Sequence, residues 1–222
     1  MSQNYDDMTP EERRPDILEA VLGHVPFDGW SDRAVSMAAR ELGLSAAYIK
    51  LAFPGGLDEM VDTFLQDADR RMMERLGDLD PQNMRIRDKI ATAVETRLAI
   101  NVPYREAVQK TVTYLAQPHK VALSTKAVWR MADLIWRWAG DVAADYNHYT
   151  KRAILSAVYS STLLIWLGDD SEAYHETSAF LDRRIDNVMQ FEKIKAQMTK
   201  ATSGLPNIAS IFGKIRYPER RA

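Results

Sequence analysis

The feature that most limits the fold is an uncharged apolar stretch of fifteen residues, Ala153 to Leu167. A helix needs about 20 consecutive apolar residues to cross a bilayer, so this stretch is too short to span one. A helix that is apolar on every face has to be covered by neighbouring helices or by a ligand. The stretch therefore predicts a buried central helix, and the rest of the chain has to supply the helices around it.

The remainder of the chain shows helical periodicity, and no run of alternating β-branched residues indicates a strand. Proline and glycine residues divide the chain into about nine segments of helical character. Ser31 and Ser45 are expected to cap the second and third helices, and a final long helix is expected from about Ser171 to Lys200. The prediction is an all-α helical bundle.

The chain lacks cysteine, which excludes disulfide scaffolds, thiolate metal sites and thiol nucleophiles. Residues 1–14 carry four acidic and two basic side chains without an apolar run. This pattern is typical neither of a secretory signal nor of an arginine-rich transit peptide. We therefore expect a cytoplasmic protein.

Residues 15–56 have the layout of a helix-turn-helix, with the turn at residues 42–45. The layout resembles the N-terminal region of TetR-type regulators, and Tyr48 to Pro54 follow in part the aromatic and Phe-Pro pattern that closes their third helix. DNA binding requires basic side chains that neutralise phosphates, but residues 15–69 carry only three basic against ten acidic residues. We expect no nucleic-acid binding, and a TetR-type ligand-responsive transcriptional regulator is kept as the alternative function.

Several further motifs occur in order and with compatible spacing. They are GHVPFDGW and LAFPGG near the front, RLAINVPYREAV in the middle, and AGDVAADYNHYTKRAILSAVYSSTLLIWLGDDS in the second half. Together they resemble the lipid-binding protein family of coenzyme Q (ubiquinone) biosynthesis, the ninth COQ protein, over roughly residues 15–190. The resemblance implies a TetR-like fold and a non-catalytic accessory protein that binds polyprenylated quinone intermediates. It also implies that these lipids are presented to the di-iron hydroxylase of the pathway at the membrane surface.

The same resemblance implies a surface that binds the di-iron demethoxyubiquinone hydroxylase or an equivalent enzyme, and a homodimer. The partner-binding surface falls on Asp133, Ile135, His148 and Tyr149. The chain departs from the family at His148, where a tryptophan is usual, and at residues 143–144, where Ala-Ala replaces Ser-Thr. The alternative is that Asp133 and Tyr149 are ordinary surface residues.

The central helix contains small polar side chains at Ser156, Ser160, Ser161 and Thr162. Small residues on a central helix can leave a channel, and each methylene buried in an apolar channel contributes about 0.8 kcal/mol. The alternative is an ordinary close-packed core. Together with the resemblance, this pattern predicts a cavity for an isoprenoid or quinone lipid, lined by Trp129, Met131, Trp136, Tyr159, Leu163, Leu164 and Trp166.

The end of the chain combines an apolar stripe with basic charge. Residues 183–222 carry nine basic against three acidic residues. As a helix, the end places Lys214 opposite a stripe formed by Leu205, Ile208, Ile211, Phe212 and Ile215. This combination is typical of reversible binding to a membrane surface. We expect attachment to the inner face of a bacterial membrane, or to the matrix side in an organelle; the alternative is a helix that docks on its own body or on a second subunit.

The expected organisation is a flexible N-terminus at 1–14, a degenerate helix-turn-helix at 15–56, a lipid-binding helical domain at 57–200 and a membrane-associating tail at 204–222. The sequence contains no phosphate-binding glycine loop and no hydrolase or metalloprotease motif, so we expect no catalysis and no cofactor. A metal enzyme is the other alternative, because Asp145 with His148 and Glu172 with His175 form carboxylate-x-x-His pairs like those of di-iron bundles. The middle helices offer few further carboxylates, so we expect no metal.

Overall fold

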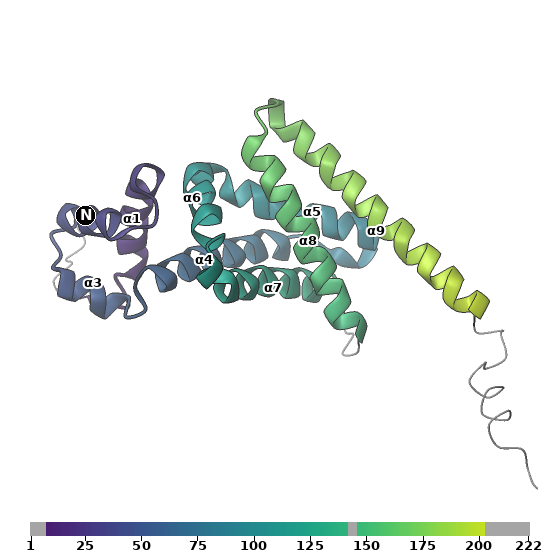
Figure 1. The fold of residues 1–222 in the computed structure, drawn as a ribbon, viewed down its shortest axis with the longest axis horizontal. Coiled ribbons are helices and arrows are strands. Elements are labelled where there is room, and N and C mark those ends of the chain that lie inside the picture. The colour runs from purple at the N-terminus through teal and green to yellow at the C-terminus, as the bar shows by residue number, and fades with distance from the viewer. Residues whose placement is uncertain (1–7, 142–145, 203–222) are drawn as a thin grey trace, which may run out of the picture. The chain divides into compact units, whose positions relative to one another are not determined.

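The computed structural model of the chain describes residues 8–141 and 146–202, and these ranges contain nine α-helices and no strand (Figure 1). The helices are α1 (Arg14–Asp28), α2 (Asp32–Glu41), α3 (Ala46–Ala52), α4 (Gly56–Gly77), α5 (Ile86–Asn101), α6 (Arg105–Leu115), α7 (Val121–Trp138), α8 (Tyr146–Gly168) and α9 (His175–Thr202). The prediction of an all-α fold of about nine helices is confirmed. The additional amphipathic helix predicted after residue 204 lies outside the described residues.

The chain divides into two compact units, residues 1–181 and residues 182–222. The first unit contains α1 to α8 and the first turns of α9. In the described part of the chain, no helix combines the length and the apolar character needed to cross a bilayer. All sites described below belong to the first unit.

The turns between the first helices follow from local sequence signals. The hydroxyl of Ser31 accepts a hydrogen bond from the backbone N–H of Ala34 at 3.2 Å, and Ser45 caps α3 in the same way at 3.1 Å. Gly43 adopts φ of 66°, a left-handed conformation that other residues rarely reach, and so allows the turn between α2 and α3. Both predicted caps are confirmed.

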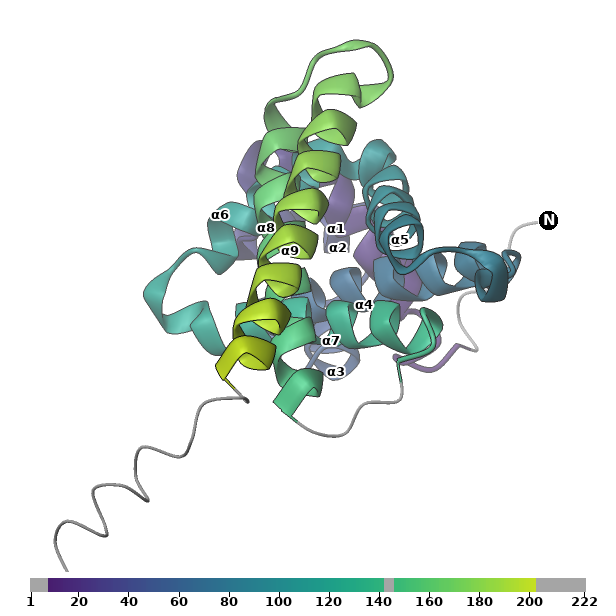
Figure 2. The ribbon, with the colours of Figure 1, turned by 90° about the vertical axis from the view of Figure 1, so that its right-hand side faces the viewer.

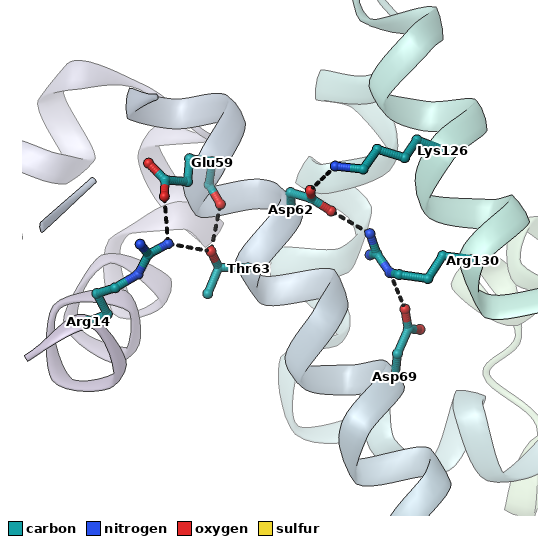
Figure 3. Close-up of polar contacts among 7 residues, drawn as sticks. All are labelled: Arg14, Glu59, Asp62, Thr63, Asp69, Lys126 and Arg130. Atoms are coloured by element: carbon teal, nitrogen blue, oxygen red, sulfur yellow. Dashed lines mark hydrogen bonds and ion pairs between the residues drawn. The ribbon is translucent and has the colours of Figure 1, made fainter. Parts of the chain in front are cut away.

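The helix-turn-helix region is fixed to the helices that follow it. Trp30, just after α1, donates its indole hydrogen to the hydroxyl of Thr111 in α6 at 2.8 Å, and both side chains are buried. Arg14 donates from one guanidinium nitrogen to Glu59 at 2.7 Å and to Thr63 at 3.2 Å, both in α4 (Figure 3). These contacts make α1 to α3 part of the same compact unit as the later helices.

Four long helices build the rest of the first unit. The contacting pairs are α4 with α5, α5 with α8, α8 with α7, and α7 with α4, so the four helices close a ring (Figure 2). The short helix α6 contacts both α1 and α7 and lies against this ring. The helix α6 thus connects the first helices of the chain to the ring.

Two expectations about the second half are corrected. The central helix α8 is not covered on every face, because Leu164 is 60% and Ile165 39% exposed. The last helix begins at His175 rather than at Ser171, because residues 172–174 form a separate 3₁₀ turn. In that turn Ala173 and Tyr174 have positive φ values, which an α-helix does not accommodate.

Candidate lipid-binding cavity and partner surface

A cavity of about 260 Å³ lies between α4, α5, α6, α7 and α8. Helical periodicity places its lining residues: on α7 they recur at three- and four-residue steps from Ser124 to Met131. Most of the wall is apolar, as shown by Phe64, Val108, Leu115, Val128, Met131 and Leu163. Ala116 and Leu164 also line the cavity and are exposed, so they form its rim at the protein surface. The cavity is slightly smaller than ordinary small-ligand pockets, whose usual volume is roughly 300–1,000 Å³.

Four of the seven residues predicted to line a lipid channel lie on this cavity. They are Met131 on α7 and Tyr159, Leu163 and Leu164 on α8. The three predicted tryptophans are not among the residues that line this cavity. Trp129 and Trp136 fall off the α7 face that repeats from Ser124 to Met131, and Trp166 lies at the end of α8 beyond the cavity.

Each tryptophan instead packs against another part of the molecule. Trp136 donates its indole hydrogen to the backbone carbonyl of Lys151 at 3.1 Å, between α7 and α8. Trp166 is buried beside Tyr174, with the Arg105 guanidinium 5.7 Å from its ring centre. Trp129 lies 6.1 Å, centre to centre, from the ring of Tyr149. Trp136 and Trp166 therefore support helix packing, and Trp129 belongs to the surface described below.

The sequence reasoning missed a polar end of the cavity, formed by Asp69, Arg97, Asn101 and Tyr159. All four residues are buried. The Nε of Arg97 donates to Asp69 Oδ1 at 3.2 Å, and its Nη1 donates to Asn101 Oδ1 at 2.6 Å. Burial raises the pKa of the Tyr159 phenol, which therefore stays protonated at neutral pH. A sequence signal was available, because Arg97 and Asn101 are one helical turn apart on an otherwise apolar face of α5.

Further charges extend this cluster from α4 to α7 (Figure 3). Arg130 Nε donates to Asp69 Oδ2 at 2.9 Å, and its Nη1 donates to Asp62 Oδ1 at 2.7 Å. Lys126 reaches the other oxygen of Asp62 at 2.9 Å. Burial alone raises the pKa of Asp62, but the hydrogen bonds from Lys126 and Arg130 outweigh burial, and the pKa is lowered. The carboxylates of Asp62 and Asp69 thus balance the guanidinium groups beside the cavity.

The residues predicted to face a partner protein separate into two sets. Tyr149 is 63% exposed, and its ring lies 5.1 Å from that of His148 and 6.1 Å from that of Trp129. We call Trp129, His148 and Tyr149 the aromatic surface. Ile135, by contrast, is 0% exposed and belongs to the core, so it does not contribute to this surface.

Asp133, the fourth predicted partner residue, mainly holds α7 to α8. Its carboxylate accepts from the Nε of Arg152 at 2.6 Å and from the Nε of Arg137 at 2.7 Å. Arg152 is 1% exposed, and its Nη1 also donates to Asp141 and to the backbone carbonyl of His148, both at 3.1 Å. This ion network fixes the start of α8, and with it the aromatic surface.

The carboxylate-x-x-His pairs do not form a metal site within the described residues, where no group of three or more potential ligands gathers. Glu172 lies in the 3₁₀ turn and His175 begins α9, so the two are not on one helix. Asp145 lies outside the described residues, as do the predicted membrane-binding residues Leu205, Ile208, Ile211, Phe212, Lys214 and Ile215.

Comparison with known proteins matches the chain to one family model and to several curated proteins of the same name. The COQ9 family model matches residues 121–192, which include α7 and α8. The chain is 33% identical over 223 residues to the ubiquinone biosynthesis protein COQ9, mitochondrial, of Xenopus tropicalis, covering 96% of this chain and 68% of that relative. It is 31% identical over 210 residues to the protein of the same name from Homo sapiens, covering 91% of this chain and 66% of the relative. The chain thus spans about two thirds of the length of these relatives.

The fold has a counterpart among solved structures. The crystal structure of a TetR transcriptional regulator from Nitrosomonas europaea matches with a TM-score of 0.65, covering 78% of this chain and 95% of that chain. The two sequences are 20% identical. The match confirms the predicted TetR-like fold.

Proposed function

Because the chain belongs to the COQ9 family of ubiquinone biosynthesis proteins, we propose that it is a non-catalytic lipid-binding accessory protein of that pathway. It binds polyprenylated quinone intermediates and presents them to the di-iron hydroxylase of the pathway at a membrane surface. The observation that carries the proposal is the cavity enclosed by the helices α4 to α8, with its apolar wall and exposed rim.

The size of the cavity limits what it encloses. At about 260 Å³ it lies just below the range of ordinary small-ligand pockets, so it shelters one part of a long lipid at a time. Each methylene moved from water into the apolar wall contributes about 0.8 kcal/mol. The exposed rim at Ala116 and Leu164 provides the route by which the rest of the chain leaves the cavity.

Filling the cavity is expected to remove the bound lipid. Val128 lines the cavity from α7, and Val128→Trp places an indole ring where the ligand lies. Solvent extraction and native mass spectrometry of the purified protein should detect isoprenoid in the wild type and reduce it to background in the variant. Overpacking is expected to cost about 1–3 kcal/mol of folding stability, which thermal unfolding monitors.

A matched control is Val121→Trp, which makes the same change on the same helix at an exposed position outside the cavity. This control should carry as much isoprenoid as the wild type. Equal lipid content in the Val128→Trp variant, or none in the wild type, would contradict lipid binding in this cavity.

The aromatic surface is the proposed docking site for the hydroxylase. Exposed aromatic side chains are enriched among residues that dominate binding energy at interfaces. Tyr149→Ala is expected to weaken the complex with the hydroxylase by about tenfold or more, measured by surface plasmon resonance. Phe27→Ala removes another highly exposed aromatic ring, in α1, and should leave the affinity unchanged. Equal losses in both variants would argue against a site at Tyr149.

The proposal places the protein peripherally on a membrane through its basic, amphipathic end. The relatives are named mitochondrial proteins, which is compatible with the matrix-side location as well as with a bacterial inner face. The protein is also proposed to act as a homodimer, and the exposed Ile165 on α8 supplies apolar area outside the cavity rim. A TetR-type regulator would share the fold, but α1 to α3 offer few cations for DNA, and one of them, Arg33, pairs with Asp28 at 3.1 Å.

A further inference from the structure

The cavity is polar at one end and apolar at the other. Asp69, Arg97, Asn101 and Tyr159 are buried, whereas the rim at Ala116 and Leu164 is exposed. A cavity for a hydrocarbon alone gains nothing from buried polar groups, because each of them has to be hydrogen-bonded to offset its desolvation. The two ends therefore suit an amphiphile whose polar part lies inside and whose chain extends to the rim.

Two hydrogen bonds fix the Arg97 side chain at the polar end, one to Asp69 and one to Asn101. Arg97 donates to the amide oxygen of Asn101 at 2.6 Å, which turns the amide nitrogen of Asn101 away from the guanidinium. Asn101 also lies close enough to Tyr159 to lower the pKa of its phenol, although burial raises that pKa more strongly. A tyrosine hydroxyl has one hydrogen to donate. Tyr159 lines the cavity, so this hydrogen is available to an oxygen of a bound ligand.

The charges at this end favour a neutral ligand. Arg97 is paired with Asp69, and Arg130 bridges Asp69 and Asp62. The two carboxylates therefore balance the two guanidinium groups, and the third cation of the cluster, Lys126 on Asp62, is 66% exposed to solvent. A phosphate entering the cavity would lose its hydration and would meet Asp69 as well as the cations, whereas a carbonyl or phenol oxygen requires only a hydrogen-bond donor.

We propose that Asn101 and Tyr159 form a head-group site, in which Tyr159 donates a hydrogen bond to an oxygen of a neutral quinone or phenol ring while the prenyl chain runs toward the rim at Ala116 and Leu164. This inference rests on the proposed lipid-binding function and adds the class of head group and its orientation. The head group is held inside the protein during transport and leaves the cavity when the lipid is handed to the enzyme.

The test compares three probes on the full chain by isothermal titration calorimetry. They are a ubiquinone with a single isoprene unit, a branched hydrocarbon of similar length without a head group, and the anionic phospholipid dihexanoyl phosphatidylglycerol. The quinone should bind more tightly than the other two. Tyr159→Phe removes only the hydroxyl, and it is expected to weaken quinone binding by about two- to tenfold while hydrocarbon binding stays the same.

Ser161→Ala is the matched control, because it removes a hydroxyl from α8 two residues further on, at a position outside the cavity lining where the hydroxyl bonds only to backbone carbonyls of the same helix. It should change neither affinity. Tighter binding of the phospholipid than of the quinone, an unchanged quinone affinity in Tyr159→Phe, or equal losses for quinone and hydrocarbon would each overturn the head-group site and leave the lipid-binding function intact. Failure of the wild type to bind both the quinone and the hydrocarbon would overturn the proposed function itself.

Discussion

Replacing Arg152 by methionine is expected to lower the free energy of unfolding by about 3–5 kcal/mol. Arg152 is 1% exposed and pairs with Asp133 at 2.6 Å and with Asp141 at 3.1 Å. The methionine preserves most of the side-chain volume but leaves these carboxylates without their shared buried cation. Urea denaturation followed by circular dichroism measures the loss.

Lys151→Met provides the control for this experiment. Lys151 contacts the same carboxylate, Asp141, at 2.6 Å, but its side chain is 39% exposed. Ion pairs of that exposure contribute about 1 kcal/mol or less, so the variant should remain close to the wild type. Similar losses in the two variants would show that burial of the Arg152 guanidinium is not what stabilises the joint between α7 and α8.

The Arg152 variant should also affect the proposed partner site. Arg152 donates to the backbone carbonyl of His148 and anchors the start of α8 on Asp133 in α7. Tyr149 and Trp129 come from these two helices, so their relative position depends on this joint. The Arg152→Met variant is therefore expected to weaken hydroxylase binding although Arg152 itself is inaccessible to a partner.

The boundaries of the early helices could be predicted because their signals are local. Ser31 and Ser45 each accept a hydrogen bond from a backbone N–H three residues later, and Gly43 supplies the conformation of the turn. The start of α9 was misplaced because its determinants are tertiary. Asp169 accepts hydrogen bonds from the backbone and side chain of both Ser171 and Thr177, and these bonds hold the chain in a turn before the helix begins.

The lining of the cavity could be predicted only in part, because it also depends on how the helices pack. The apolar character of α7 and α8 indicated that a cavity could be lined there, but it did not show which face each large residue occupies. Met131 and Ile135 lie one turn apart and are both buried, so helical periodicity already contained the signal against an exposed Ile135. The polar end depends on Arg97 of α5 meeting Asp69 of α4, a pairing between distant residues that no local pattern specifies.

Removing residues 204–222 is expected to abolish flotation with anionic vesicles. The stripe of Leu205, Ile208, Ile211, Phe212 and Ile215 contributes roughly 0.75–1.5 kcal/mol per side chain if each is half buried in the interface. Each basic residue near an anionic surface adds about 1 kcal/mol, and the segment contains four, Lys214, Arg216, Arg220 and Arg221. Since about 1.4 kcal/mol corresponds to a factor of ten, the affinity for vesicles should fall by about a thousandfold or more.

Two single substitutions separate the apolar contribution from the charge. Ile211→Asn interrupts the stripe, and Ser210→Asn introduces the same side chain on the other face of the predicted helix. Only Ile211→Asn should reduce flotation strongly, whereas added salt should weaken the binding of both variants because it screens the basic residues. If the segment instead docks on the protein's own body, its removal would lower the unfolding temperature and leave flotation unchanged. That outcome would indicate that the lipid-binding unit or its partner, rather than this segment, binds the membrane.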